Sequence, residues 1–418
     1  MKLKEDLVRI ARRAKIAYRH SCNISADIKN QALRDMAAAL LAHQDNLIRE
    51  NRKDLKAAAL KKLKGAFLER LSLDEQRIKQ MSDSLLEIAA LADPVGEVIK
   101  AWRRPNGLWI HKVRVAIGVI AIIYESRPNV TSDCIGLCFK SGNSVILRGG
   151  SEAFHSNLYI YNLLRGCLEK YGVDEGMINM VTTTDRRAVA ELLQLDEYID
   201  LAMPRGGEGL IRKVAEISRI PVIKHYKGVC HVYVDKYADR QMAEKISFNA
   251  KVQRPGVCNA MECLLVHHDI AAKFLPSMIK KLKGAGVEIH GCPVTGALVK
   301  GVLPATKKDY YTEYLDLKLS VKVVKSLQEA IEHINHYGSG HSDSIVTERY
   351  ENAMEFLRQV DSACVYVNAS TRFTDGYQFG MGAEIGISTD KLHARGPMAL
   401  EELTTYKYLV FGNGQVRK

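Results

Sequence analysis

The sequence predicts an α/β protein with two doubly wound parallel-sheet domains and a small β-flap. From Val115 onward, short apolar strands alternate with helical segments, and this alternation is typical of parallel sheets covered on both faces by helices. The alternation runs in two successive series. The chain of 418 residues is also much longer than the roughly 150 residues of one average domain.

The segments before the first sheet predict helices and then a hairpin. In residues 1–92 apolar side chains recur at helical spacing, and Asp27 can cap one of these helices. A further helix near 74–91 ends before Asp93-Pro94. The apolar segments 98–102 and 108–110 flank a Pro-Asn-Gly turn, which predicts a β-hairpin.

Both sheet-forming series can be written as alternating elements. The first series predicts strands at 117–124, 144–148, 178–182, 198–203 and 222–224, with helices near 131–141, 151–170, 185–195 and 208–219. The second predicts strands at 262–266, 286–290, 319–324, 343–346 and 364–368, with helices at 271–284, 326–337 and 349–360. A last β segment spans 404–411, near the C-terminus.

Composition excludes several protein classes. With 47% hydrophobic and 26% charged residues, the chain is neither disordered nor collagen-like. The longest near-apolar stretch, 115–124, is too short to cross about 30 Å of hydrocarbon, so we expect no membrane partner. The N-terminus lacks the apolar region of a secretory signal. Nine scattered cysteines without a CxxC pair indicate a reducing, cytoplasmic environment without disulfides.

The net charge of +12 raises the question of whether the protein binds an anionic partner. The densest basic clusters, 61–64 and 280–283, lie in helical patterns without interleaved aromatic residues, which is typical of solvated helix faces. Nucleic-acid binding is therefore not expected. Diffuse positive charge suits an enzyme that handles anionic phosphates.

Two strand-to-helix junctions are candidate anion sites, and each joins glycines, a basic side chain and free amides at a helix start. Ligands of open α/β sheets bind beyond the carboxyl ends of strands, where both junctions fall. Either Gly-Gly alone could simply make a tight turn, but two such junctions in one sheet favour a nucleotide. The candidate residues are Arg148, Gly149, Gly150, Ser151, Arg205, Gly206 and Gly207. The later GxGxxxG at 380–386 is one residue longer than the dinucleotide fingerprint, so we interpret it as a close-packed turn.

Cys258 is the candidate nucleophile. It follows a Pro-Gly pair at the start of the second series, where free amides near a turn activate a thiol and form an oxyanion pocket. Cys263 precedes a strand and is interpreted as core. A Cys–His hydrolase stays open as an alternative, although none of the 13 histidines carries a signature marking it as the base for Cys258. No metal is predicted, because the histidines lack ligand spacings and His225 and His231 have no nearby companions.

Five motifs in order resemble the aldehyde dehydrogenase superfamily, most closely its branch that reduces an acyl phosphate in proline biosynthesis. The resemblance covers essentially the whole chain. The motifs are 124–130 (YESRPNV), 141–143 with 147–152, 254–260 (RPGVCNA), 324–330 with 341–343, and 393–397 with 403–408.

The resemblance implies a two-stage reduction. Cys258 would attack L-glutamyl 5-phosphate and release phosphate, and NADPH would reduce the resulting thioester to L-glutamate 5-semialdehyde. The Cys258 amide and Asn129 would hold the oxyanion. Arg127, His341 and Arg395 belong to the motifs and are candidates for binding the amino and carboxylate groups of the substrate.

Two departures from the superfamily pattern are informative. General aldehyde dehydrogenases carry a glutamate that activates water for hydrolysis, whereas the matching stretch here, 224–228 (KHYKG), has no carboxylate. This difference argues against the alternative of an aldehyde-oxidising dehydrogenase. The adenosine-side lysine of the superfamily is replaced at Arg148, and an arginine there can pair with the 2′-phosphate of NADP.

The resemblance also divides the chain. It implies a cofactor-binding domain of 1–97, 116–231 and 369–398, a catalytic domain of 232–368, and an oligomerisation flap of 98–115 and 399–418. The flap strands are too small to fold alone. We therefore expect a homo-oligomer with a small-molecule substrate, and an association with a glutamate kinase stays open.

Overall fold

The predicted fold class is confirmed by the computed structural model, which describes residues 2–21, 24–61, 66–125 and 127–417. The chain forms two compact units. Unit 1 comprises Met1–Lys224, Gly380–Gly386 and Met398–Lys418, and unit 2 comprises His225–Phe379 and Ile387–Pro397. Within the described residues, no helix has the length and apolar character needed to cross a bilayer. Cys22, Ser126 and most of the basic cluster 61–64 lie outside the described residues.

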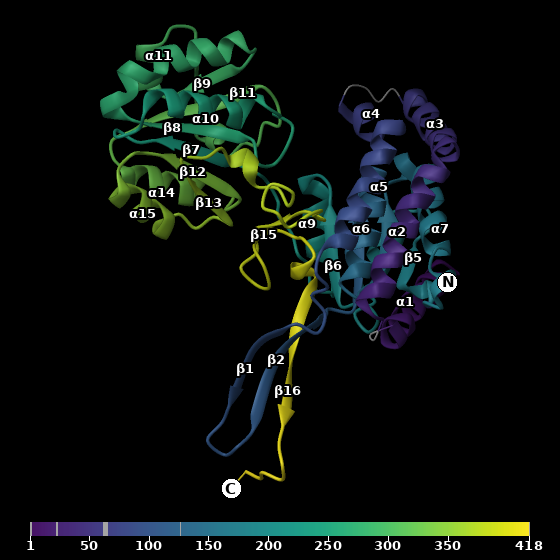
Figure 1. Cartoon of the computed structure of the whole chain (residues 1–418). Helices are drawn as coiled ribbons and strands as arrows, with labels where there is room; N and C mark the ends of the chain where they lie inside the picture. The colour runs from purple at the N-terminus through teal and green to yellow at the C-terminus, as the bar shows by residue number, and fades with distance from the viewer. Residues whose placement is uncertain (1, 22–23, 62–65, 126, 418) are drawn as a thin grey trace. The chain divides into compact units, whose positions relative to one another are not determined.

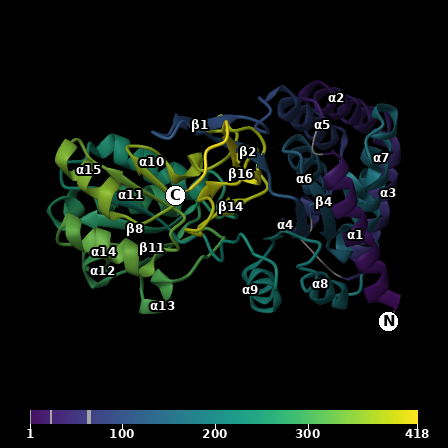
Figure 2. The same ribbon diagram turned by 90° about the horizontal axis from the view of Figure 1, so that it is seen from below.

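Unit 1 begins with helices, as expected: α1 (Lys2–Ser21), α2 (Ala26–Ala42), α3 (Gln44–Leu60), α4 (Ala66–Leu71) and α5 (Glu75–Ala90). The predicted cap of α2 was wrong. Ser25 caps this helix by accepting the Ile28 N–H at 3.3 Å, and Asp27 lies in the first turn, where a carboxylate favours the helix dipole. Helices α2, α5 and α6 (Asn129–Lys140) pack side by side (Figure 1, Figure 2).

The sheet of unit 1 has four parallel strands in the order β5-β4-β3-β6. They are β3 (Val119–Tyr124), β4 (Ser144–Gly149), β5 (Ile178–Met180) and β6 (Leu201–Arg205). Every residue of β3 is buried, which explains its fully apolar sequence. The predicted strand at 222–224 reduces to a single bridge between Ala202 and Val222, because Pro221 has no N–H to extend the ladder.

The strand order places a topological switch beside β3. The chain passes from β3 to β4 on one side, whereas β6 lies on the other side of β3. At such a switch the connections diverge and leave a crevice at the carboxyl ends of the strands. Tyr124 and Arg205 are paired at this edge, just before the start of α9 (Glu208–Ile217).

An antiparallel ribbon of three strands completes unit 1. It consists of β1 (Val98–Arg103), β2 (Trp109–Ala116) and β16 (Thr404–Phe411), in the order β1-β2-β16 (Figure 1). The predicted hairpin and C-terminal strand are therefore confirmed. Aromatic side chains on this ribbon stay exposed, including Trp109 and Phe411 at 48% and 54%.

The sheet of unit 2 has seven parallel strands in the order β10-β9-β11-β8-β7-β12-β13. They are β7 (Cys230–Val234), β8 (Met261–His267), β9 (Glu288–Gly291), β10 (Leu303–Pro304), β11 (Lys318–Val324), β12 (Ser342–Val346) and β13 (Cys364–Val367). Helices α10 (Arg240–Val252) and α11 (His268–Gly284) cover one face. Helices α14 (Leu327–Tyr337) and α15 (Tyr350–Gln359) cover the other (Figure 1).

The sequence analysis missed β7 and α10, and these elements affect where the boundary between the two units lies. The expected division at 231/232 cuts β7, which pairs with both β8 and β12 near the centre of the second sheet. The chain therefore enters unit 2 at His225. Residues 387–397 also belong to unit 2, whereas the 380–386 turn belongs to unit 1, with positive φ at Gly380 and Gly382.

Candidate functional site

Cys258 lies in the loop that joins α10 to β8, at the amino end of the strand. Its side chain is half-buried and is not part of a disulfide. The loop turns at Pro255-Gly256 and closes with a hydrogen bond from the Ala260 N–H to the Val257 carbonyl at 3.1 Å. The structure therefore presents this thiol on a turn, as the sequence predicts.

Two histidines accompany Cys258. The Cys258 Sγ and one ring nitrogen each of His225 and His341 lie within 4.8 Å of one another, and the two rings meet edge to face at 5.7 Å. His341 directly precedes β12, and its Nδ1 is 2.8 Å from the Ser342 hydroxyl. Because β7, β8 and β12 are parallel neighbours, the segments that lead into them converge at one edge.

His225 is a functional candidate that the sequence analysis did not identify as a base. It lies in the stretch that lacks the superfamily's carboxylate, and that alignment was the available signal. In the structure an imidazole occupies the neighbourhood of the thiol. A neutral imidazole can accept the proton of Cys258 and return it later, which is the usual activation of a nucleophilic cysteine.

Gly228 lies close to the backbone of the loop that carries Cys258. A Cβ on this residue would lie 1.8 Å from the Cys258 carbonyl oxygen and 2.6 Å from its Cα, so no larger residue fits without moving the loop. The Gly228 N–H donates to Glu313 Oε1 at 2.9 Å. The Cys230 thiol also lies 3.2 Å from the same carbonyl oxygen.

A buried ion pair connects the two ends of the loop that carries Cys258. Lys251, at the end of α10, donates to Glu262, in β8, at 2.6 Å, and both side chains are almost fully buried. Burial raises the pKa of Glu262 to about 7 although Lys251 opposes the change, and burial lowers the pKa of Lys251. Glu262 Oε1 also accepts the Leu315 N–H at 3.1 Å. The loop is thus anchored at both ends.

Arg372 provides a cation beside Cys258, and no motif in the sequence indicated this residue. Its guanidinium hydrogen-bonds to the Asn259 side chain and donates through Nε to Gln253 at 2.8 Å. Burial lowers the pKa of Arg372, and the charge of Arg254 lowers it further, whereas Cys258 acts in the opposite direction. An arginine in this position can attract an anionic substrate group.

Arg395, a candidate substrate ligand, is engaged with a carboxylate of its own. Its Nη1 lies 2.9 Å from Asp361 Oδ1, and Lys391 pairs with the same carboxylate. These two cations lower the pKa of Asp361. Arg395 also lies beside the loop of His341, because a Cβ on Gly340 would be 3.6 Å from its Nη2.

Asn129 and Arg127 lie after β3 in unit 1. Asn129 begins α6, and its side-chain amide donates to Asp133 Oδ2 at 3.2 Å. Burial raises the pKa of Asp133 to about 6, although hydrogen bonds from Ser84 and Asn129 oppose this. Cys258 belongs to unit 2, so the expected oxyanion pair of Asn129 and Cys258 stays a prediction.

The first candidate anion junction follows β4. Arg148 is largely buried and donates to the carbonyls of Gly149 and Thr184 at 2.9 and 3.3 Å. Its Nε is buried without a hydrogen-bond partner among the described residues. Gly149 and Gly150 lead into the short helix that begins at Ser151. The nearby Arg186 is exposed and adds a second positive charge, which the sequence analysis did not single out.

The second junction is occupied by a carboxylate from the same unit. Gly207 precedes α9, and its N–H donates to Glu125 Oε2 at 3.0 Å. A Cβ on Gly206 would lie 2.4 Å from the same oxygen. One of the amides that the sequence analysis assigned to a phosphate, that of Gly207, therefore already has an anionic partner. Arg205 lies beside this position, close to Gly386.

Comparisons with known proteins agree with this architecture. The profile of the "Aldehyde dehydrogenase family" matches residues 2–299 and 319–408. A gamma-glutamyl phosphate reductase of Thermodesulfovibrio yellowstonii is 56% identical over 100% of both chains, and one of Caldanaerobacter subterraneus is 55% identical over 98% of this chain and 99% of its own.

A solved structure extends the comparison to the fold. The crystal structure of gamma-glutamyl phosphate reductase from Thermotoga maritima has a TM-score of 0.97, with 47% identity over 99% of this chain and 100% of that one. These findings confirm the resemblance drawn from the five motifs. The chain belongs to the aldehyde dehydrogenase family of oxidoreductases.

Proposed function

We propose that the chain reduces L-glutamyl 5-phosphate to L-glutamate 5-semialdehyde and phosphate in proline biosynthesis, through a thioester on Cys258 and with NADPH as reductant. The observation that carries this proposal is the half-buried Cys258 thiol within 4.8 Å of His225 and His341. The names of the relatives at 54–56% identity supply the substrate.

The first step is an acyl transfer to sulfur. His225 accepts the thiol proton of Cys258, and the thiolate attacks the acyl carbon of the substrate. The Cys258 N–H and the Asn129 amide stabilise the oxyanion. The carbon–oxygen bond to phosphate then breaks, and His225 returns the proton to the departing phosphate. The acyl group stays bound to the enzyme as a thioester.

The second step converts the thioester to the aldehyde. The cofactor, when bound, supplies a hydride to the thioester carbon. The Cys258 sulfur holds that carbon in place, and the oxyanion donors again stabilise the negative oxygen. The carbon–sulfur bond then breaks, which releases L-glutamate 5-semialdehyde and the thiolate. The thiolate takes up one proton from solvent, so the cycle consumes one proton in all.

The composition of the site favours reduction over hydrolysis. Among the described residues, the group of ligand-type side chains around Cys258 contains His225 and His341 and no carboxylate. A reductase of acyl phosphates gains nothing from a glutamate that activates water against its own thioester. The alternative of an aldehyde-oxidising dehydrogenase needs that water-activating base, so this site favours it less.

The residues of unit 1 fit a phosphorylated dinucleotide. The crevice beside β3 is the usual place for such a ligand in an open sheet. Arg148, with its buried Nε without a hydrogen-bond partner in the described part of the chain, and the exposed Arg186 are candidates for the 2′-phosphate of NADPH. At the same edge of the sheet, the cofactor would also lie close to Gly149, Gly150 and Ser151.

The junction after β6 contributes to cofactor binding in a different way from the one that the sequence analysis expected. We propose that Arg205, Gly206 and Gly207 face the cofactor, with the Glu125 carboxylate between the Gly207 amide and any phosphate. A carboxylate in this position repels a phosphate and accepts a hydrogen bond from a sugar hydroxyl. This arrangement favours a ribose contact at Glu125.

The substrate's own charged groups require ligands near Cys258. We propose that His341 and Arg395 bind the amino and carboxylate end of the substrate together with Arg127. Arg372 is a further candidate for the carboxylate, because it is hydrogen-bonded to the residue after the nucleophile. Its planar guanidinium suits a carboxylate better than an ammonium group does.

The oligomeric state and the cellular location are proposed from different observations. We propose a homo-oligomer formed through the β1-β2-β16 ribbon, whose aromatic side chains are exposed. The eight cysteines in the described part of the chain are all free, which suits the reducing cytoplasm. A glutamate kinase that hands over the labile acyl phosphate is an additional candidate partner.

Replacing the nucleophile tests the chemical proposal. In Cys258→Ser a weakly acidic hydroxyl replaces the thiol, so turnover of glutamate 5-semialdehyde with NADP and phosphate, followed at 340 nm, falls by several orders of magnitude. NADPH affinity changes by less than about tenfold, because the proposed phosphate contacts are in unit 1. The matched control is Cys167→Ser, another half-buried thiol, which keeps its activity. Retention of more than a few per cent of turnover in Cys258→Ser would contradict the proposal.

The role of the neighbouring imidazole is tested by His225→Asn. We expect kcat to fall by about 10²–10⁴-fold, as for loss of a general acid–base group. Alkylation of Cys258 by iodoacetamide at neutral pH should also slow, because the thiol loses its proton acceptor. The control His290→Asn changes a histidine of β9 that pairs with Glu288 and is not in the Cys258 group. An unchanged alkylation rate would remove His225 from the mechanism.

Deleting residues 404–418 removes β16 and tests the assembly. We expect the full chain to sediment as a homo-oligomer at micromolar concentration, and the truncated chain to give monomers or aggregates. The double variant Trp109→Ser/Phe411→Ser should weaken assembly without removing the strand. In contrast, Leu60→Ser alters an apolar side chain that is 86% exposed outside the ribbon and should have no effect. A monomeric full-length chain would refute the proposed oligomer.

A further inference from the structure

A second group of ligand-type side chains lies inside unit 2, apart from Cys258. It consists of His231 in β7, Cys263 in β8 and His333 in α14. All three are buried, with exposures of 0%, 0% and 3%. None of them has a part in the mechanism proposed above. Their separation in the sequence explains why spacing gave no signal of a site.

The sheet register brings the first two residues together. His231 is paired with Cys263 on one neighbouring strand and with Asp343 on the other. Residues paired in a parallel sheet point to the same face, so the carboxylate, the imidazole and the thiol lie in one row. Helix α14 covers this face and contributes His333. The result is a His-Cys-His cluster within the protein interior.

The separations suit a metal ion. The Cys263 Sγ lies 3.8 Å from His333 Nε2, and all three ligand atoms lie within 4.8 Å of one another. With Zn–S bonds of about 2.3 Å and Zn–N bonds of about 2.0–2.1 Å, tetrahedral ligands are separated by about 3.4–3.6 Å. The sulfur–nitrogen pair is therefore close to the required distance, and the third ligand needs only a modest side-chain shift.

The His231 ring is hydrogen-bonded to a carboxylate, as the ring of a metal-bound histidine usually is. Its Nδ1 lies 2.9 Å from Asp343 Oδ1, which also accepts the His231 backbone N–H at 2.7 Å. The carboxylate thereby fixes the proton on Nδ1 and leaves a lone pair on Nε2. That Nε2 is buried without a hydrogen-bond partner among the described residues. A carboxylate behind a histidine is the usual outer support of a metal-bound imidazole.

An ordinary hydrogen-bonded cluster does not account for this nitrogen. A buried acceptor without a donor is unfavourable, because it has given up its hydrogen bond to water. A metal ion would use the lone pairs of both imidazoles and the sulfur at once, with the Cys263 thiol losing its proton to solvent.

We propose that His231, Cys263 and His333 form a second site in unit 2 that binds one transition-metal ion of the Zn²⁺ class, linking β7, β8 and α14. The ligand set of two imidazoles and one thiolate selects such borderline-soft ions over Mg²⁺ or Ca²⁺. The proposal does not depend on the reaction assigned to Cys258.

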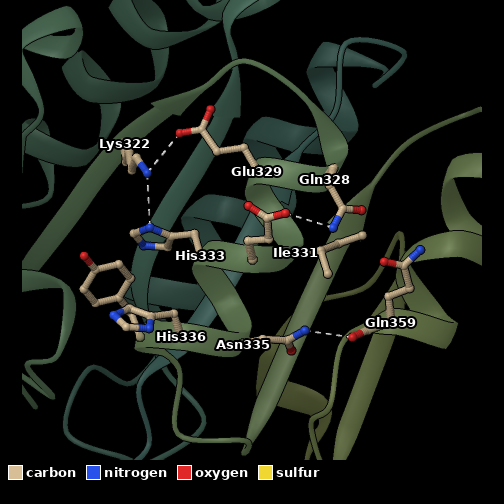
Figure 3. A pocket seen from close by; sticks show the side chains of 10 residues that line it. Lys322, Gln328, Glu329, Ile331, His333, Asn335, His336 and Gln359 are labelled. Carbon is tan, nitrogen blue, oxygen red and sulfur yellow. Dashed lines mark hydrogen bonds and ion pairs between the residues drawn. The ribbon is translucent and has the colours of Figure 1, made fainter.

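Lys322 supplies a specific prediction about this site. Its Nζ lies 3.4 Å from His333 Nδ1 and 3.1 Å from Glu329 (Figure 3). The bond to Nδ1 requires the His333 proton on Nε2, whereas a metal on Nε2 requires it on Nδ1. Metal binding must therefore move Lys322 from His333 toward Glu329. These residues line an open pocket of about 620 Å³, which offers an ion a route to His333 (Figure 3).

The test titrates Co²⁺ and Zn²⁺ into the reduced, oxygen-free full-length Cys258→Ser variant, which removes the other thiol-containing group. We expect one ion per chain, a cobalt–thiolate charge-transfer band, and protection of Cys263 from alkylation as mapped by mass spectrometry. Cys263→Ser on the same background should lose the band, and His231→Gln should lower affinity by about 10–100-fold. Lys322→Met should raise affinity by at least about threefold, because a repelling cation is removed.

The matched control is Cys292→Ser on the same background, because Cys292 is a buried thiol of unit 2 outside the cluster. It should bind the metal as the parent does. Circular dichroism shows whether each variant folds, and the alkylation map of the parent remains decisive if Cys263→Ser does not. The absence of stoichiometric binding and of Cys263 protection in the parent would overturn the proposal, as would a charge-transfer band that persists in folded Cys263→Ser.

Discussion

The buried ion pair between Lys251 and Glu262 is the constraint on which the candidate site depends. It ties the end of α10 to β8 and so fixes both ends of the loop that presents Cys258. The same carboxylate holds the backbone of Leu315, which has a positive φ of 52°. Two residues earlier, Glu313 accepts the N–H of Gly228, and Gly228 packs against the backbone of Cys258. Through these contacts, the buried ion pair helps to position three segments near the Cys258 thiol. They are the loop that carries Cys258, the segment around Leu315 and the segment around Gly228.

The same strands of unit 2 supply two chemically different groups. Residues that lead into β8 and β12 place Cys258 and His341 at the amino edge of the sheet, where the thiol is half-buried. Further along, His231 and Cys263 point into the covered face, where water is excluded. The first group suits reaction with a substrate, and the second suits a ligand that stays. Exposure, more than residue type, separates the two roles.

Much of the fold was predictable, because buried parallel strands are continuous apolar runs, and Val119–Tyr124 is such a run. The strand Cys230–Val234 was missed since it contains a histidine whose polarity is satisfied only by Asp343, a contact made in three dimensions. Cys258 was singled out as a candidate through its motif. The position of Arg372 and the proximity of His225 to His341 were not predicted. In each case, residues that lie far apart in the sequence come together only when the parallel strands pair.

Hydrogen exchange in the loop that presents Cys258 tests this account most directly. The double variant Lys251→Met/Glu262→Gln removes both buried charges, so it should fold while losing the anchor. The account predicts amide exchange at least about tenfold faster in residues 253–260 and 224–229, a local loss of about 1.4 kcal/mol, with α1 exchanging as in the parent chain. Unchanged exchange in those two loops would contradict the central role of the ion pair.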